Sequence, residues 1–507
     1  MSTRPAPLLT LLLLIGCDPG LEAGEPFYQG GDVIQLIDAG PAADARGADG
    51  QPEADAGVAD DAAPRPDARP DRDAEAPAPD AEAPAPDAQV PPPDMAPPPP
   101  DMAPPPPVEG PARYTADRLH SPVTPFVRDT LRQIVARDGG RRGNVFAKIG
   151  DSLTVSNSFL KCFAGNGVEL DGRDALAPTI RHFLGGAAGG TDPFRRDSLA
   201  ATVGWSAISA LRGDPSPIDQ EVDALDPRLA VVMFGTNDIQ RANITAYADE
   251  MFDIVDLLLS QGIIPLLSSI PPRGDSAAAD DVVPSYNAIV RGIAEGRQIP
   301  FMDLEKALRP LPRFGLAGDR LHGSTYQRGG SYLPCAFTPE GLQHGYNWRN
   351  LLAIESLHRV LTSVLGDAEV PDPPAPARRG AGTPADPFLI DTFPFTHVAD
   401  TREATSRAYN RYPGCGANQD ESGPEYVYRL DLDAPTTLRA YVFDRGTVDI
   451  DIHLLGDTDP DTCLDRDHTG FAASLDPGTW YFVLDTFVGA DGQPDAGEFL
   501  FVLVADP

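Results

Sequence analysis

At residues 144–153 the chain reads Asn-Val-Phe-Ala-Lys-Ile-Gly-Asp-Ser-Leu, an apolar run that stops at a glycine and two polar residues. A second apolar run, Leu229-Ala-Val-Val-Met-Phe234, is followed in the same way by Gly235-Thr236-Asn237-Asp238. Short apolar runs that end at turn residues are typical of buried strands. Each run therefore predicts a strand that places polar side chains at its carboxyl end.

Amphipathic segments alternate with such runs between residues 113 and 366. The hydrophobic spacing predicts helices at residues 123–136, 198–211, 246–260, 282–295 and 347–365, and further strands at residues 263–270 and 300–302. Strands that alternate with helices predict an α/β domain with a parallel sheet covered on both faces. Ligands of such sheets bind at the carboxyl ends of the strands, so we expect a site where the two polar clusters meet.

The region before this domain has a composition that cannot form a core. Residues 18–112 hold 21 acidic and 4 basic residues, and residues 91–107 contain 11 prolines. Because such a segment buries little apolar surface, we expect a disordered stalk rich in Pro, Ala and Asp. The chain as a whole has a net charge of −35, and it lacks the basic surface that a nucleic-acid partner would require.

Residues 1–17 have the pattern of an export signal. Arg4 precedes an apolar run, Leu8 to Ile15, that is too short to span a bilayer. The end of this segment, Leu14-Ile15-Gly16-Cys17, resembles the lipobox of bacterial lipoproteins. The resemblance implies cleavage before Cys17 and lipidation of its thiol. The protein would then be exported to the bacterial cell envelope, in the periplasm or on the outer surface, with a lipid anchor as its membrane contact.

After a Pro-rich linker, residues 367–382, the pattern changes to short strand-like runs separated by turns. The runs lie at residues 426–432, 438–443, 448–454, 480–484 and 499–504. They predict an antiparallel β-sandwich over residues 383–507. This region resembles the pre-peptidase C-terminal domain family, which implies an accessory module on a secreted enzyme. Asp449 and Asp451 are interpreted as solvated strand positions, because the surrounding acids lack the loop spacing of a calcium site.

Four short blocks follow one another in the central region: Gly150-Asp151-Ser152-Leu153, Gly204-Trp205, Gly235-Thr236-Asn237-Asp238 and Asp319-Arg320-Leu321-His322. Their order resembles the SGNH (GDSL) hydrolase superfamily over about residues 140–366. The resemblance implies a flavodoxin-like three-layer fold. It also implies a catalytic triad of Ser152, Asp319 and His322, and an oxyanion hole formed by Ser152, Gly204 and Asn237.

The chemistry of these residues fits the same roles. A serine hydroxyl needs a base to remove its proton, and a histidine acts as that base when a carboxylate orients its ring. Asp319 stands three residues before His322, close enough for one turn to join them. His344, which follows Glu340 by four residues, is the alternative base. Asp151 and Asp238 are interpreted as supporting hydrogen-bonding groups.

The sequence therefore predicts a serine ester hydrolase that forms an acyl-enzyme and cleaves short-chain acyl or acetyl esters of carbohydrate. The alternative is a catalytically inactive binding or adhesion lipoprotein that uses the same domains as a scaffold. We expect no cofactor, and no metal because no pair of histidines has ligand spacing. A small-molecule or polysaccharide ester is the expected partner, and the oligomeric state is left open.

Apart from Cys17, the chain has four cysteines: Cys162, Cys335, Cys415 and Cys463. Export makes disulfides possible, and four cysteines allow three connectivities. The first two lie in the central region and the last two in the predicted sandwich. Domain membership therefore favours Cys162–Cys335 and Cys415–Cys463.

Overall fold

The computed structural model of the chain describes residues 110–375 and 377–506. The predicted signal with its lipidated Cys17, and residues 18–109 of the predicted stalk, lie outside this range. None of the helices in the described ranges combines the length and the apolar character that crossing a membrane requires.

The central domain is built on a parallel sheet, as the alternating pattern predicts. Its strands lie in the order β1 (Arg142–Gly150), β2 (Pro227–Met233), β3 (Ile264–Ser268) and β4 (Phe301–Met302). The last residue of β1 is paired with the last residue of β2, Gly150 with Met233. The two polar clusters therefore leave the sheet side by side, at the carboxyl ends of adjacent strands.

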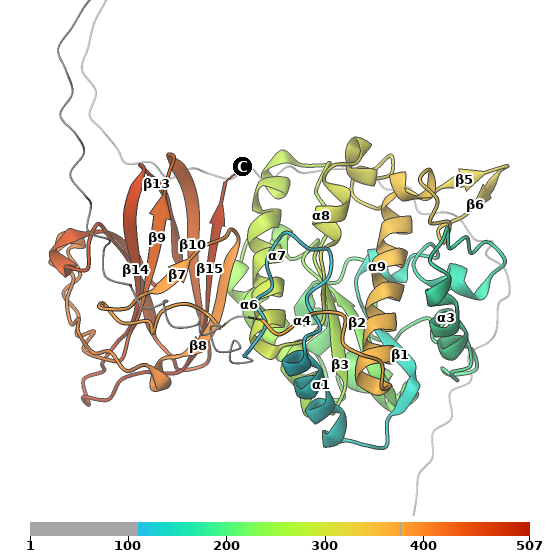
Figure 1. The fold of residues 1–507 in the computed structure, drawn as a ribbon, viewed down its shortest axis with the longest axis horizontal. Helices are drawn as coiled ribbons and strands as arrows, with labels where there is room; N and C mark the ends of the chain where they lie inside the picture. The colour runs from blue at the N-terminus through green and yellow to red at the C-terminus, as the bar shows by residue number, and fades with distance from the viewer. Residues whose placement is uncertain (1–109, 376, 507) are drawn as a thin grey trace, which may run out of the picture. The chain divides into compact units, whose positions relative to one another are not determined.

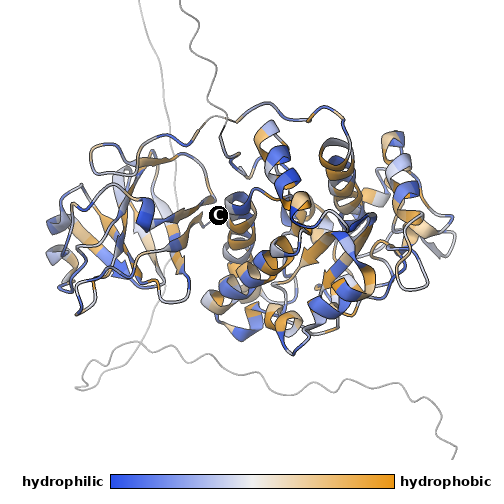
Figure 2. Ribbon diagram, turned by 90° about the horizontal axis from the view of Figure 1, so that it is seen from below, coloured by the Kyte–Doolittle hydropathy of each residue, from blue (hydrophilic) through white to orange (hydrophobic). Residues whose placement is uncertain are grey.

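Helices cover both faces of this sheet (Figure 1). They are α1 (Pro125–Arg137), α2 (Ser152–Val155), α3 (Ala177–Leu184), α4 (Ala207–Leu211), α5 (Pro217–Leu225), α6 (Ile244–Ser260), α7 (Ala277–Arg297), α8 (Leu304–Leu308) and α9 (Gly345–Val360). The pair α6 and α7 packs together on one side, and α3 and α9 contact each other on the other side. Apolar residues fill the strands and the helix sides that face them (Figure 2). This arrangement has the three layers that the sequence predicts.

The helix predicted at residues 198–211 is wrong over residues 198–206. Residues 200–202 instead run alongside the end of β1, where Gly150 N donates to Ala200 O and Thr202 N donates to Gly150 O. Gly204 then adopts a φ of +80°, which ends any helical path, and only α4 is helical. The helix α5 was not predicted, although Ser216 and Asp219 form a capping box at its start and Pro217 occupies the first helical position.

The C-terminal region is a sandwich of two sheets, as predicted. Its strands are β7 (Phe388–Ile390), β8 (Phe395–Asp400), β9 (Tyr426–Leu432), β10 (Thr436–Asp444), β11 (Ile450–Leu455), β12 (Cys463–Asp467), β13 (Gly470–Leu475), β14 (Gly478–Thr486) and β15 (Glu498–Ala505). One sheet has the order β13-β10-β15-β8 and the other β12-β11-β14-β9-β7. All pairs are antiparallel except β7 with β9. Phe395, Phe482 and Phe501 fill the core between the sheets.

The sandwich packs directly on α7 of the central domain, and the described residues of both belong to one compact unit. A Cβ atom on Gly292 would lie 2.6 Å from Leu500 Cδ1, and a Cβ on Gly296 would lie 2.5 Å from Val398 Cγ2. Only glycine allows the strands to approach the helix so closely. We call this contact between α7 and strands β8 and β15 the α7 seam.

Candidate active site

Ser152 lies at the turn between β1 and α2, where the strand ends and the short helix begins. A Cβ atom on Gly150 would lie 2.7 Å from Met233 O and would clash with Thr154, so this tight turn requires glycine. Asp151 caps the helix, because its Oδ1 accepts a hydrogen bond from Leu153 N at 2.9 Å. The turn therefore holds Ser152 at the carboxyl edge of the sheet.

Ser152, His322 and Asp319 form a continuous line of hydrogen-bonded side chains. Ser152 Oγ lies 2.9 Å from His322 Nε2, and His322 Nδ1 lies 2.7 Å from Asp319 Oδ2. A carboxylate can only accept, so Nδ1 carries the ring proton and Nε2 is left to accept from the serine hydroxyl. The three groups have the connectivity that nucleophilic attack by the serine requires.

Asp319 is fixed by more than the imidazole. Its Oδ1 accepts hydrogen bonds from Leu321 N and His322 N, each at 3.1 Å. Partial burial opposes ionisation of Asp319, but the hydrogen bonds from Leu321 and His322 outweigh it and hold the pKa of the carboxyl below its ordinary value. The group is therefore a carboxylate whenever the imidazole is neutral.

Gly204 and Asn237, the other residues of the expected oxyanion hole, lie in two loops, one after the segment that runs along the end of β1 and one after β2. The φ of +80° at Gly204 turns the chain in the left-handed region, which disfavours any residue with a Cβ atom. Asn237 Nδ2 donates to Trp205 O at 2.8 Å, which fixes the amide with one hydrogen used. Its other contact, to Asp151 Oδ2 at 3.4 Å, is long for a hydrogen bond.

Asp238 links the two loops that carry these donors. Its carboxylate is buried and accepts from Ala207 N at 2.9 Å and from Gly235 N at 3.0 Å. Burial raises the pKa of Asp238 to about 6 and that of Asp151 to about 6. Both carboxyl groups support the backbone around the site, and neither contacts Ser152 Oγ within the hydrogen bonds of the described residues.

In the structure His344 makes no hydrogen bond with Ser152 among the described residues. His344 Nδ1 lies 2.9 Å from Ser324 Oγ, at the start of α9. Burial lowers the pKa of His344. Of the two candidate bases, His322 alone lies between the serine and a carboxylate.

Arg349 is a residue of this site that the sequence analysis missed. It extends from α9 beneath α2, where its Nη2 donates to Thr154 Oγ1 at 2.9 Å and its guanidinium lies 3.7 Å from the ring centre of Phe159. Burial lowers the pKa of Arg349 to about 10. A signal existed in the sequence, since polar residues interrupt the apolar pattern of the last helix at Asn347, Arg349 and Asn350.

Both predicted disulfides, Cys162–Cys335 and Cys415–Cys463, are present. The first joins the loop after α2 to a segment that follows His322 by thirteen residues. The second lies in the sandwich, where it joins the turn at Cys415 to the start of β12.

Potential metal-ligating side chains gather in the sandwich and not around Ser152 in the described part of the chain. Glu421, Asp451 and His453 are buried within 4.8 Å of one another. His453 Nε2 lies 2.5 Å from Glu421 Oε2, and Arg466 contacts Asp451. The cluster thus contains its own cation, and we interpret it as a buried ionic network.

This network corrects the interpretation of Asp451 as a solvated position. Its side chain is 1 % exposed and accepts from Gln419 Nε2 at 2.9 Å. Asp449, two residues earlier on the same face, keeps 42 % of its side chain exposed. The strand pattern is the same for both, and the segment that carries Gln419 and Glu421 covers only Asp451.

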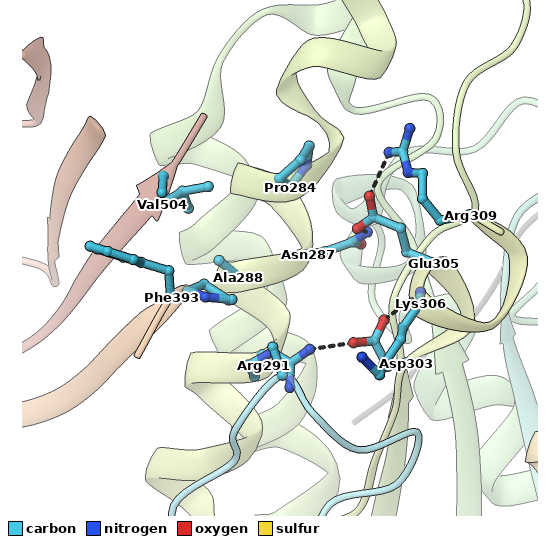
Figure 3. Close-up of a pocket in the computed structure, with 13 residues that line it drawn as sticks. Pro284, Asn287, Ala288, Arg291, Asp303, Glu305, Lys306, Arg309, Phe393 and Val504 are labelled. Atoms are coloured by element: carbon cyan, nitrogen blue, oxygen red, sulfur yellow. Dashed lines mark hydrogen bonds and ion pairs between the residues drawn. The ribbon is translucent and has the colours of Figure 1, made fainter. Parts of the chain in front are cut away.

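A hollow of about 430 Å³ lies beside the α7 seam (Figure 3). Its walls include Phe393 and Val504 of the sandwich and several charged residues of the central domain. The charged groups pair with one another, Arg291 with Asp303 and Glu305 with Arg309. None of the predicted site residues lines this hollow.

Residues 149–325 match the model of the GDSL-like Lipase/Acylhydrolase family. The matched range contains all five residues that the sequence analysis placed in the triad and the oxyanion hole. Together with the parallel sheet, this match gives the central domain an SGNH hydrolase fold. Comparison with curated proteins gives no match.

Several solved structures resemble parts of the chain. A GDSL-like lipase from Bacteroides thetaiotaomicron is 16 % identical, with a TM-score of 0.27, over 46 % of this chain and 99 % of its own. An acetylxylan esterase from Geobacillus stearothermophilus is 16 % identical, with a TM-score of 0.28, over 43 % of this chain and 94 % of its own. The pre-peptidase C-terminal domain of a Bacillus anthracis collagenase is 12 % identical, with a TM-score of 0.16, over 23 % of this chain and 91 % of its own.

Proposed function

We propose that the protein is a serine ester hydrolase that cleaves carboxylic esters through an acyl-enzyme on Ser152. The observation that carries the proposal is the line of contacts from Ser152 Oγ to His322 Nε2 at 2.9 Å and from His322 Nδ1 to Asp319 Oδ2 at 2.7 Å. The family match of residues 149–325 supports the same class of reaction.

The first half of the reaction transfers the acyl group to the enzyme. Ser152 Oγ attacks the carbonyl carbon of the ester while its proton passes to His322 Nε2, and Asp319 stabilises the imidazolium. The tetrahedral oxyanion accepts hydrogen bonds from Ser152 N, Gly204 N and Asn237 Nδ2. Collapse breaks the bond to the alcohol oxygen, which takes the proton from His322, and the acyl group remains on Ser152.

The second half releases the acid. A water molecule gives its proton to His322 Nε2 and attacks the acyl carbon, and Ser152 Oγ leaves with that proton. The same oxyanion donors serve both steps because the oxygen occupies the same place in both intermediates. No group beyond the protein and water is needed for the balance.

We assign short-chain acyl or acetyl esters of carbohydrate as the substrates. The site is open to water: 32 % of the His322 side chain and 52 % of the Asp319 side chain are exposed. Such openness suits a hydrophilic, bulky alcohol group, whereas a long acyl chain needs an extended apolar wall to leave water.

The test of the reaction class is hydrolysis of p-nitrophenyl acetate by Ser152→Ala. Loss of the nucleophile should lower kcat by about 10⁴-fold or more, with the fold unchanged by circular dichroism. Ser260→Ala, at the exposed end of α6, is the matched serine control and should keep its activity. Wild-type turnover by Ser152→Ala would refute the mechanism.

We also propose that the enzyme acts at the bacterial cell envelope, attached through a lipid on Cys17. The lipobox-like Leu14-Ile15-Gly16-Cys17 and the disulfide-forming cysteines support export. Membrane fractions of cells fed labelled palmitate should contain the labelled wild-type protein, and Cys17→Ser should lose both label and membrane association. An unlabelled wild-type protein would contradict this proposal.

A further inference from the structure

A groove of about 550 Å³ lies between the loop of residues 157–167 and the hairpin formed by β5 (Gln327–Arg328) and β6 (Ser331–Tyr332). Its lining includes Asn157, Ser158, Lys161, Asn166, Tyr332 and Leu333. The hairpin belongs to the long segment between His322 and α9.

Both walls of the groove start at the catalytic residues. Ser158 stands six residues after Ser152 on one wall, and Thr325 stands three residues after His322 on the other. The walls meet where Thr325 Oγ1 donates to Ser158 Oγ at 3.0 Å. Because Ser158 lines the groove, this contact links the groove to the two loops that carry Ser152 and His322.

The walls are fixed relative to each other. The disulfide Cys162–Cys335 crosses between them. Asn350, fully buried on α9, accepts from Leu160 N at 2.7 Å and donates to Ser158 O at 2.8 Å and to Pro334 O at 3.0 Å. The amide thus bonds to the backbone of both walls, and the groove has its shape before any ligand arrives.

Backbone pairing below the groove adds to this rigidity. Glu169 N donates to Cys335 O at 3.0 Å, and Phe337 N donates to Glu169 O at 2.8 Å. The Glu169 carboxylate also forms an ion pair with Arg328 of the hairpin. These contacts fix the hairpin and the segment after it against the chain around Glu169.

The open face of the groove has the chemistry of a sugar-binding surface. The Tyr332 ring is 66 % exposed, one of few large apolar side chains of the described residues that is exposed to this degree. Lys161 Nζ donates to Asn157 Oδ1 at 2.9 Å and also forms an ion pair with Asp197, and together with Asn166 these groups give the groove a polar side. An aromatic face suits the C–H side of a pyranose ring, while the polar groups suit its hydroxyls.

We propose that this groove is the alcohol-side subsite, which binds an oligosaccharide chain whose O-acyl group lies at Ser152. This inference rests on the proposed esterase function and narrows its carbohydrate substrate to a chain of several sugar units bound in this groove. The groove takes several linked sugar units and not a fatty acyl chain, because an uncompensated apolar chain would desolvate Asn157, Lys161 and Asn166.

The first experiment distinguishes binding of a sugar chain in the groove from ester hydrolysis at Ser152. Wild-type protein is assayed on p-nitrophenyl acetate, on O-acetylated monosaccharides, and on O-acetylated tetrasaccharides of xylose, glucose and N-acetylglucosamine. We expect kcat/KM per acetyl group to be at least tenfold higher on one of the tetrasaccharides than on its monosaccharide, mainly through a lower KM. Equal values on both lengths for all three sugars, with p-nitrophenyl acetate still cleaved, overturn the groove and leave the esterase. Loss of all hydrolysis instead overturns the proposed function.

The second experiment assigns the effect to Tyr332. In Tyr332→Ala the ratio of kcat/KM on the preferred tetrasaccharide to kcat/KM on p-nitrophenyl acetate should fall about tenfold, whereas Tyr332→Phe should keep the wild-type ratio because the ring remains. Leu464→Ala, which removes another exposed apolar side chain (58 % exposed) on the sandwich, is the control and should also keep it. An unchanged ratio in Tyr332→Ala, or an equal fall in Tyr332→Phe, contradicts a stacking surface.

Discussion

The two oxygens of Asp319 have different partners, and this division makes the Asp-x-x-His turn a complete unit. Oδ1 accepts from the backbone of Leu321 and His322, which shapes the turn, and Oδ2 accepts from the imidazole. The base is thus oriented by a residue of its own loop. Its geometry depends on that loop alone, and the rest of the domain has only to bring the loop to Ser152.

The choice between the two histidines can be tested directly. His322→Ala should lose nearly all hydrolysis of p-nitrophenyl acetate, on the order of 10³-fold or more, because no base accepts the serine proton. His344→Ala should keep most activity, since its ring bonds to Ser324. Rates across pH 5–9 for both variants make the comparison. The reverse ranking would assign the base to His344.

Asp151 gives a prediction for stability against pH. Burial raises its pKa to about 6 in the folded protein, from an ordinary value of 3.8. Between these values the folded state binds a proton that the unfolded state lacks, so stability falls as pH rises from about 4 to 6. Two pKa units correspond to about 3 kcal/mol.

Chemical denaturation at pH 4 and pH 7 measures this effect. The unfolding free energy of Asp151→Asn relative to the wild type should rise by about 3 kcal/mol between the two pH values. Asp129→Asn, which removes an exposed carboxylate on α1, is the control and should show no such trend. A constant difference between Asp151→Asn and wild type would mean that Asp151 is ionised at both pH values.

The contacts that the sequence could indicate at the residue scale are local ones. Asp319 and His322 lie within one turn, and Ser152 and Asn237 stand in the loops that follow β1 and β2. Asp451 was misinterpreted because its burial depends on a segment thirty residues away in the chain. The spacing of a strand shows which face a side chain takes, but not what covers that face.

At the scale of elements, the local sequence pattern predicted the buried strands, whereas contacts between distant segments determined the structure of residues 198–206. The apolar runs predicted the parallel strands because a buried strand leaves a continuous hydrophobic signal. The segment at residues 198–206 has a helix-like composition, yet it pairs with the end of β1 and turns at Gly204. Edge pairing of this kind depends on the neighbouring strand and leaves little trace in local periodicity.

Both disulfides should stabilise the fold, but only one of them should affect substrate binding. Replacing either pair with serine should lower the unfolding free energy by about 2–5 kcal/mol. Only the Cys162→Ser/Cys335→Ser variant should also raise KM for the preferred O-acetylated tetrasaccharide, because that bridge holds the groove walls. The Cys415→Ser/Cys463→Ser variant, with its bridge in the sandwich, is the matched control. Thermal unfolding and steady-state kinetics on the two variants check this prediction. Equal KM values would mean that the Cys162–Cys335 bridge does not contribute to substrate binding in the groove.

At the scale of the whole molecule, the α7 seam joins the two domains by packing as well as by charge. The ion pair Arg297–Glu498 crosses it, and the pairs Arg445–Asp256 and Arg439–Asp281 join the two domains next to it. Leu500, Val502 and Val504 of β15 belong to the same hydrophobic cluster as the central domain. The sandwich is therefore part of the folded unit of the enzyme.

Gly296→Leu should show how much the seam contributes. The new side chain would clash with Val398, and overpacking of this kind lowers the unfolding free energy by about 1–3 kcal/mol. We expect a lower Tm and, if the domains separate, two unfolding transitions by calorimetry in place of one. Gly139→Leu, in open space outside α1, controls for the substitution itself. An unchanged Tm in Gly296→Leu would mean that the α7 seam accommodates the larger side chain without loss of stability.

The seam also limits how the chain can be divided. A fragment that ends at residue 366 would expose the apolar side of α7 around Gly292 and Gly296 to water, with no strand to cover it. Bare apolar stripes on a helix attract one another, so the truncated enzyme should be prone to self-association. The sandwich therefore acts as a cover for the central domain, and its removal should lower the solubility of that domain whether or not the sandwich binds a ligand.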